Sequence, residues 1–396
     1  MNNLMEEGNN SFVPTYSQFP IVLDKGEGRY VKDIEGKSYL DMVAGIAVNS
    51  LGYNDSEFNE ALKSVIDYGL LHCSNLYYNQ HAVKAASLLC ALSGMDRVFF
   101  CNSGTEANEA ALKLSRKFGK KFSPIKETII TMESSFHGRT YGSMSATGQV
   151  KYQKSFTPLV PKIIHSPLND FDALKAKVDE TTCAIFVEVI QGEGGITCAD
   201  ASFLQQVRTL CDEKEILLVF DEVQCGMGRT GKAFAWQHTS VVPDVMTLAK
   251  ALGNGVPIGA MVVKGEASNV FAPGDHAATF GGNLLSTRAA LVVLNRIKEG
   301  SLLEHVSLVG SYFKEQLHLL KEQYPVIKEV RGMGLMIGIE LHEEVKPLIS
   351  ECMEEGMLIV SAGTHVLRFV PPLTITKKEV DEGLSILKGV FKRRFG

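Results

Sequence analysis

The stretch RVFFCNSGTEANEAALKLSRKFGK, residues 97–120, contains an apolar run, a short turn and a helical pattern in direct succession. In its second half the apolar residues recur at helical spacing, at Ala107, Ala110, Ala111, Leu114 and Phe118. The stretch therefore predicts a strand that leads directly into an amphipathic helix, which is the repeating unit of α/β folds.

Three more apolar runs are typical of buried strands: TIITMES (128–134), AIFVEVIQ (184–191) and ILLVFDEV (216–223). Each is apolar on both faces, and helical patterns separate them, as in a mostly parallel sheet that helices cover on both sides. We expect a large α/β domain over residues 61–286.

The two ends of the chain carry a different pattern. The stretches GEGRYVKDIEGKSYLD (26–41) and EVRGMGLMIGIEL (329–341) combine strand-like segments with glycine-containing turns. We expect the N-terminal segment, residues 1–60, to pack with the C-terminal residues 287–396 as a smaller α+β domain.

The composition argues against several classes of partner. The chain has 396 residues, of which 45% are hydrophobic and 21% charged, and its formal net charge is −5. We therefore expect no nucleic-acid partner and no anionic-membrane partner. No apolar run approaches the ~20 residues of a membrane span, and MNNLMEEGNN (1–10) lacks the pattern of a signal peptide. The histidines and cysteines form no metal-binding signature, so we expect a cytoplasmic protein without a metal.

Lys250 is the only charged residue in VMTLAKALGNGVPIGA (245–260). Burial lowers the pKa of an amine, and a neutral amine is a nucleophile that condenses with carbonyl compounds. A surface lysine whose stem lies on apolar side chains is the commoner explanation for any single residue of this kind. The interpretation of Lys250 therefore depends on the neighbouring motifs.

Three other motifs follow predicted strands, where ligands bind in open α/β sheets. Asp221 closes one apolar run and could hold a protonated ring nitrogen. The motif NSGTEA (102–107) offers a helix N-terminus with the hydroxyls of Ser103 and Thr105 as an anion site. The motif SFHGRT (135–140) offers an aromatic ring and a guanidinium. Singly, each is better explained as a helix cap, a core aromatic or a surface ion pair.

A fourth motif, GMGRTGK (226–232), has the glycine and lysine spacing of a nucleotide-binding loop. Ala233 stands where that loop needs a hydroxyl residue for Mg²⁺, and no clear helix follows. A nucleotide-binding protein is therefore the weaker alternative.

Together, the lysine and the first three motifs offer what pyridoxal 5′-phosphate needs: contacts for its phosphate, ring faces, ring nitrogen and aldehyde. Several stretches also resemble the class III, fold type I aminotransferases, among them FCNSGTEANEAALKLSRKF, EVIQGEGG, FDEVQCGMGRTG, LAKALGNGVPIGA and TFGGN. The resemblance covers nearly the whole chain and is greatest to members that act on N-acetylornithine. It implies a fold type I transferase that uses pyridoxal phosphate and forms a homodimer with shared active sites.

By this resemblance, Lys250 would bind the cofactor aldehyde and carry the proton, and Asp221 would pair with the ring nitrogen. The other cofactor contacts that the resemblance implies are Ser103, Gly104, Thr105, Phe136, Glu222, Val223 and Gln224, with Thr279 of the partner subunit reaching the phosphate.

The resemblance also implies the substrate contacts. Arg139 would bind the far carboxylate of both substrates, and Arg368 would bind the α-carboxylate of glutamate, with Glu193 as its partner at other times. Ala278 stands where the family usually has a hydroxyl residue near the substrate. The implied reaction moves the δ-amino group of N2-acetyl-L-ornithine to 2-oxoglutarate. Succinylornithine, ornithine and 4-aminobutyrate are alternative donors, and a non-catalytic homologue that binds the cofactor is an alternative of another class.

Overall fold

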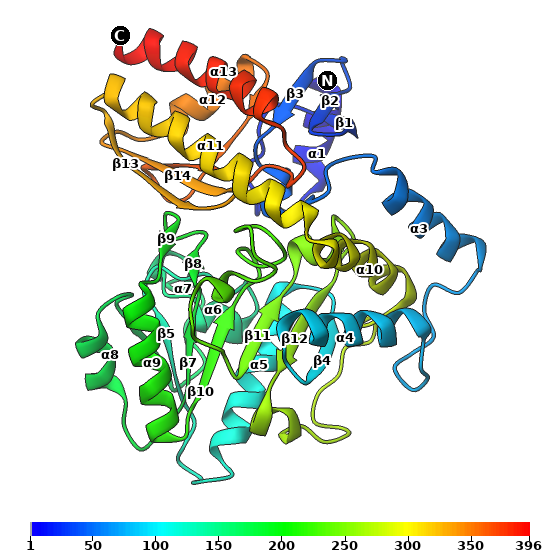
Figure 1. Cartoon of the computed structure of the whole chain (residues 1–396), viewed down its shortest axis with the longest axis vertical. Coiled ribbons are helices and arrows are strands. Elements are labelled where there is room, and N and C mark those ends of the chain that lie inside the picture. The colour runs from blue at the N-terminus through cyan, green and yellow to red at the C-terminus, as the bar shows by residue number, and fades with distance from the viewer. Residues whose placement is uncertain (1) are drawn as a thin grey trace.

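The computed structural model describes residues 2–396; Met1, the first residue of the expected N-terminal segment, lies outside that range. A larger part is built around one extended sheet, and a smaller part brings both ends of the chain together (Figure 1). None of the helices within residues 2–396 is long and apolar enough to cross a membrane.

Seven strands form the central sheet, in the order β4-β12-β11-β10-β7-β5-β6. They are β4 (Arg97–Cys101), β5 (Thr128–Met132), β6 (Ile163–Ser166), β7 (Thr182–Val187), β10 (Leu217–Asp221), β11 (Val245–Leu248) and β12 (Gly259–Val263). Only β12 runs against its neighbours, so the sheet is mostly parallel, as the sequence predicts. Every residue of β5, β7, β10 and β11 is buried, which explains why these runs are apolar on both faces.

Helices cover both faces of this sheet. Successive strand residues point to opposite faces, and Leu217 packs in one core cluster with α5 (Gly104–Gly119), whereas Leu218 packs in another with α9 (Ala201–Lys214). Strand β4 and helix α5 are therefore the strand–turn–helix unit that residues 97–120 predict.

Two helices cross the expected domain boundaries after residues 60 and 286. They are α3 (Ser56–Asp67) and α10 (Leu284–Glu299), and their apolar side chains share one core cluster with strands β11 and β12. Because a helix packs as one unit, we propose that the large domain keeps both helices whole, over residues 56–299.

Both ends of the chain build the smaller part. The strands near the N-terminus are β1 (Leu23–Glu27), β2 (Tyr30–Asp33) and β3 (Ser38–Asp41), and β15 (Met357–Leu358) extends their sheet beside β3. A second sheet contains β13 (Ile327–Met333), β14 (Met336–Leu341), β17 (Val366–Phe369) and β16 (Val360–Ser361). Helices α11 (Ser301–Gln323), α12 (Lys346–Glu354) and α13 (Lys377–Phe395) pack against these strands.

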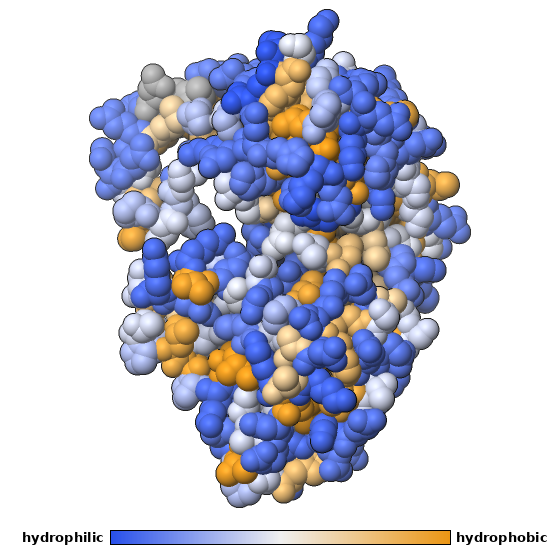
Figure 2. Space-filling view, turned by 90° about the vertical axis from the view of Figure 1, so that its left-hand side faces the viewer, coloured by the Kyte–Doolittle hydropathy of each residue, from blue (hydrophilic) through white to orange (hydrophobic). Residues whose placement is uncertain are grey.

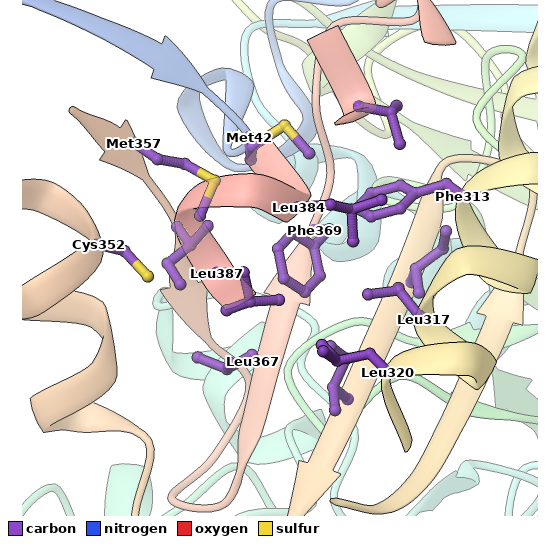
Figure 3. Close-up of a cluster of buried hydrophobic side chains, with 14 of the residues drawn as sticks. Met42, Phe313, Leu317, Leu320, Cys352, Met357, Leu367, Phe369, Leu384 and Leu387 are labelled. Atoms are coloured by element: carbon purple, nitrogen blue, oxygen red, sulfur yellow. The ribbon is translucent and has the colours of Figure 1, made fainter. Parts of the chain in front are cut away.

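Figure 3 shows the core of the smaller part, where Met42 lies among side chains from the C-terminal half such as Phe313, Phe369 and Leu384. This shared core confirms the predicted smaller unit built from both termini. On the surface drawn in Figure 2, hydrophilic side chains predominate and hydrophobic ones form separate patches.

The remaining elements are short or lie outside the sheets. They are α1 (Asn2–Ser11), α2 (Ala44–Ala47), α4 (Gln80–Ser93), α6 (Tyr141–Ala146), α7 (Val150–Gln153), α8 (Phe171–Lys177), β8 (Ile190–Gln191), β9 (Thr197–Cys198) and three 3₁₀ turns, η1 (Ala235–His238), η2 (Lys250–Gly253) and η3 (Gly265–Asn269).

The four residues of α2 all have φ between 50° and 65°, so this turn is left-handed. Each non-glycine residue in that conformation costs about 1–2 kcal/mol, and the turn leads directly to Val48, which lines the cavity described next.

Candidate active site

A cavity of about 390 Å³ opens beyond the ends of strands β4, β7, β10 and β11. Ten of the residues singled out from the sequence line it: Ser103, Gly104, Thr105, Phe136, Arg139, Glu193, Asp221, Val223, Gln224 and Lys250. The fold therefore brings together residues that lie up to 147 positions apart in the chain.

Lys250 lies two residues beyond the end of strand β11 and begins the η2 turn. Its backbone adopts a left-handed conformation, with φ at 47°, and backbone strain of this kind often occurs at functional sites. Burial lowers the pKa of the Lys250 amine to about 8, and the charge of Glu193 opposes this shift. A substantial fraction of the amine is thus neutral near physiological pH and able to act as a nucleophile.

Asp221 is the last residue of β10 and is only 3% exposed. Its Oδ2 atom lies 2.7 Å from Nδ1 of His137 and accepts a hydrogen bond from Nδ2 of Asn108 at 2.8 Å. Its Oδ1 atom accepts one from the backbone N–H of Val223 at 3.0 Å. These contacts fix the carboxylate at the wall of the cavity, where it can pair with a positive group.

His137, Asn108 and Glu188 also line the cavity, although the sequence motifs do not identify them as site residues. Burial disfavours the charged form of His137, but the hydrogen bond and charge of Asp221, with the charge of Glu188, outweigh it and raise the pKa of His137. Burial raises the pKa of Glu188 to about 8. A sequence signal existed for Glu188, because it follows the apolar run of β7 much as Asp221 closes that of β10.

The first turn of helix α5 forms one end of the cavity. Ser103 caps the helix, its Oγ accepting from the backbone N–H of Glu106 at 3.3 Å. The next backbone N–H groups, those of Gly104 and Thr105, have no acceptor within the helix, and the helix dipole makes this end favourable for an anion. A Cβ atom on Gly104 would stand 2.7 Å from Cγ1 of Val223, so only glycine leaves room there.

Arg368, on strand β17, lies behind the cavity wall rather than in its lining. Its Nη1 atom donates to Oε1 of Glu193 at 2.5 Å and to Oε1 of Gln224 at 3.1 Å. Burial works against the charge of Glu193, but the charge and hydrogen bond of Arg368 outweigh it and lower the pKa of Glu193. The Nε atom of Arg368 is buried without a hydrogen-bond partner among residues 2–396, which leaves a donor for a further acceptor.

Arg139 is exposed at the mouth of the cavity, and its guanidinium carbon lies 4.1 Å from the ring centroid of Tyr152. No carboxylate within the described part of the chain forms an ion pair with it. Arg139 is therefore available to a negatively charged group in the cavity.

Three other residues singled out from the sequence lie outside the cavity lining. The Glu222 carboxylate is turned away and accepts from the backbone N–H groups of Ala235 and Trp236, both at 2.7 Å. Ala278 is half-buried and its carbonyl accepts from the side chain of Asn75 at 3.0 Å. Thr279 is exposed.

The segment 226–232, whose spacing is that of a nucleotide-binding loop, forms turns that lead into the short η1 turn. A nucleotide-binding loop joins a strand to a full helix, and this segment lacks that context. The geometry therefore gives no support to the nucleotide alternative.

The fold and the cavity together define an enzyme of the aminotransferase type, and comparison with known proteins agrees. The sequence matches the class-III aminotransferases over residues 12–391, and the chain belongs to that family. The acetylornithine aminotransferase of Caldanaerobacter subterraneus is 50% identical to it over 378 residues, which cover 95% of this chain and 96% of that protein.

Solved structures agree with this assignment. The N-acetylornithine aminotransferase of Stenotrophomonas maltophilia has a TM-score of 0.85 and 35% identity, with 98% of each chain covered. The ornithine aminotransferase of Toxoplasma gondii has a TM-score of 0.94 and 31% identity, with 99% of this chain and 95% of that chain covered. These likenesses confirm the predicted fold class.

Class-III aminotransferases use pyridoxal phosphate, and the residues present here fit that cofactor. Gly104 leaves open the space that a Cβ would fill at the start of α5, next to Val223. A buried carboxylate, Asp221, and an amine of lowered pKa, Lys250, both line the same cavity. An anion site, a carboxylate for a protonated ring nitrogen and a nucleophile for an aldehyde are thus present together.

Proposed function

We propose that this protein moves the δ-amino group of N2-acetyl-L-ornithine to 2-oxoglutarate, giving N-acetyl-L-glutamate 5-semialdehyde and L-glutamate, a reaction of arginine biosynthesis. The observation that supports this most strongly is the contrast between two arginines. Arg139 is exposed at the cavity mouth, while Arg368 is buried and bonded to Glu193. N-acetylornithine carries a carboxylate only far from its reacting amine, whereas glutamate carries one far away and one adjacent. When N-acetylornithine is bound, Glu193 can neutralise Arg368; when glutamate is bound, its α-carboxylate can take the place of Glu193. The pair therefore suits an enzyme that binds these two substrates in turn.

In this proposal the chain holds the cofactor through its first-turn amides and its strand-end side chains. The N–H groups of Gly104 and Thr105, with the Ser103 hydroxyl, hold the phosphate. Phe136, Val223 and Gln224 line the same cavity; the two apolar side chains would hold the ring faces, and Gln224 would offer a hydrogen bond to the ring oxygen. Pyridoxal phosphate supplies an aldehyde that joins to amines, and a ring that takes up the electron pair left when the adjacent carbon loses a proton.

Asp221 and Lys250 have the central roles in the proposed reaction. The Asp221 carboxylate would pair with the ring nitrogen and favour its protonated form, with His137 and Asn108 holding that carboxylate in place. The Nζ atom of Lys250 would hold the cofactor aldehyde in the absence of substrate, and would carry a proton to or from the reacting carbon. Arg139 binds the far carboxylate of each substrate, and Arg368 binds the α-carboxylate of glutamate when Glu193 releases it.

We further propose a homodimer with shared sites, working in the cytoplasm. Large apolar side chains are exposed on the two segments that meet next to Thr279, where the side chain of Asn75 donates to the Ala278 carbonyl. They are Leu76, Tyr78 and Phe280, with Tyr78 97% exposed. An exposed apolar surface of this kind is typical of an interface. In this arrangement Thr279 of the partner subunit reaches the phosphate.

A panel of amine donors with 2-oxoglutarate as acceptor tests the proposed substrate. We expect the highest kcat/KM with N-acetylornithine, and lower values with succinylornithine, ornithine and 4-aminobutyrate. A higher value with any other donor would replace the proposed substrate. A visible cofactor band that no donor changes would identify a non-catalytic binding protein instead.

A further inference from the structure

Tyr152 contacts two residues that the proposed function uses. Its ring centroid lies 4.1 Å from the guanidinium carbon of Arg139. The ring also meets that of Phe136 edge-to-face, with centroids 5.7 Å apart and planes at 79°. The guanidinium carbon of Arg139 lies 5.5 Å from the Phe136 centroid. Arg139 therefore rests against two aromatic rings, and Tyr152 is the nearer of them.

A guanidinium that rests against an aromatic ring keeps its hydrogen-bond donors free for a carboxylate. The N–H donors of a guanidinium lie in its plane, and a carboxylate binds bidentately along an edge of that plane. A ring that attracts the cation by its face supplies no hydrogen-bond acceptor and no opposite charge. Tyr152 can thus hold Arg139 without occupying the donors that a substrate carboxylate needs.

Hydrogen bonds from two neighbouring glutamines fix the turn that carries Tyr152. Tyr152 lies in α7, between Gln149 and Gln153, and the side chains of both glutamines donate to main-chain carbonyl groups. Nε2 of Gln149 donates to the carbonyl of Ser135 at 3.0 Å, and Nε2 of Gln153 donates to the carbonyl of Thr147 at 2.7 Å. Because Ser135 begins the loop that carries Arg139, this bond ties the Tyr152 turn to that loop.

We propose that Tyr152 is a positioning residue for Arg139, holding the guanidinium so that its free edge receives the far carboxylate of both substrates. This inference rests on the role proposed above for Arg139. It assigns Tyr152 to both half-reactions, because both use the far carboxylate. The Nζ atom of Lys151 lies 4.8 Å from the same ring centroid, so the test must separate a ring that serves Arg139 from one that serves Lys151.

The experiment is a double-mutant cycle in the cofactor-loaded enzyme. Single-turnover rates are measured against donor concentration, with N-acetylornithine and with glutamate, for Tyr152→Leu, Tyr152→Phe, Arg139→Ala and the double variant Tyr152→Leu/Arg139→Ala. Binding of glutarate, an unreactive five-carbon dicarboxylate, gives a readout without chemistry. Lys151→Met tests the other cation. Tyr312→Leu is the matched control, because Tyr312 contacts Lys377 at 4.9 Å in the smaller part, away from the cavity.

We expect Tyr152→Leu to raise the half-saturating concentration of both donors, and the Kd of glutarate, by about fivefold, the loss of one cation–π contact. Tyr152→Phe keeps the ring and should stay close to wild type. In the Arg139→Ala background, Tyr152→Leu should raise neither the half-saturating donor concentration nor the Kd of glutarate any further. Tyr312→Leu and Lys151→Met should leave donor saturation unchanged.

Three results would overturn the inference. If Tyr152→Leu weakens donor and glutarate binding by the same factor in the wild type and in Arg139→Ala, the ring acts only through the fold. If Lys151→Met weakens binding as much as Tyr152→Leu does, the ring serves Lys151. If Arg139→Ala itself leaves both donors unaffected, the role of Arg139 fails, and the role of Tyr152 fails with it; in the first two cases the proposed function stands.

Discussion

The Nη1 atom of Arg368 lies 2.5 Å from Oε1 of Glu193, and the Arg368 side chain is 2% exposed. An unpaired charge buried to this degree is costly, so removing either partner leaves the other destabilised. A ligand can separate the two at low cost only if it brings a negative charge of its own to Arg368. Under the proposed function, the charge of the incoming substrate would therefore be a condition for separating the pair.

The first prediction concerns Lys250. Lys250→Ala should still bind pyridoxal phosphate through the other contacts but should not turn over, because the nucleophile and proton carrier is lost. Borohydride reduction of the wild-type holoenzyme, followed by peptide mapping, should find the cofactor on Lys250. Label on any other lysine would refute this role. When pyridoxal phosphate is added to cofactor-free protein, its reaction with the Lys250 amine should become faster as the pH rises toward about 8. Burial lowers the pKa of this amine to that value.

The second prediction concerns Asp221. Asp221→Ala should leave a bound ring nitrogen largely unprotonated, and the rate of both half-reactions should fall by about two decades or more. Stopped-flow absorbance with each donor measures this. Activity within a few-fold of wild type would mean that Asp221 does not hold the ring nitrogen. Asp200→Ala, at the start of α9 and away from the cavity, is the control.

The third prediction concerns pH and Glu188. Burial raises its pKa from 4.5 to about 8, so in that window the folded protein binds more protons than the unfolded chain. The stabilising contribution is therefore complete below about pH 4.5 and is lost as the pH rises through about 8. Glu188→Gln stays neutral and keeps an oxygen for the Phe136 N–H, which donates to Glu188 at 2.9 Å.

Urea unfolding of both proteins between about pH 5 and pH 9 measures this difference. The free energy of unfolding of the wild type should fall relative to Glu188→Gln as the pH rises. Parallel curves over that range would show that Glu188 is not held in its protonated form. Glu60→Gln, at an exposed position on α3, controls for the change of charge.

The central features of the fold and site could be predicted because they are local in the sequence. Apolar runs identify the buried strands, and Gly104, Asp221 and Lys250 stand at the ends of strands or the start of a helix. In a parallel sheet those ends meet at one edge. The sequence alone therefore indicates which residues share a cavity.

Other features depend on contacts between distant segments and could not be predicted in this way. Asn108 lies on the buried side of α5 and reaches Asp221, 113 positions further along the chain. The left-handed turn Ala44–Ala47 has no local cause apart from one glycine, and packing must support its strain. Glu222 adjoins Asp221, but the backbone N–H groups of Ala235 and Trp236, 13 and 14 positions further along the chain, hold its carboxylate away from the cavity.

The fourth prediction concerns assembly. Thr279→Trp and Lys250→Ala should each inactivate a homodimer, the first by blocking the phosphate site of the partner subunit. Mixing the two under conditions of subunit exchange should restore some activity, because one hybrid site then contains both native residues. A fully active monomer in analytical ultracentrifugation would contradict the shared site, as would mixtures that stay inactive although hybrids form.

The last prediction concerns the two arginines and tests the central claim most directly. The measurement is single-turnover spectroscopy of each half-reaction in Arg139→Ala and Arg368→Ala, following the cofactor absorbance with N-acetylornithine and with glutamate in turn. Arg139→Ala should slow the half-reaction with either donor, and the loss of transition-state stabilisation should be ~2–5 kcal/mol in each case. Arg368→Ala should slow glutamate far more than N-acetylornithine, with a smaller loss for the latter because Glu193 is left unpaired. If Arg368→Ala slows both donors equally, or Arg139→Ala spares either, the proposed division between the arginines is wrong.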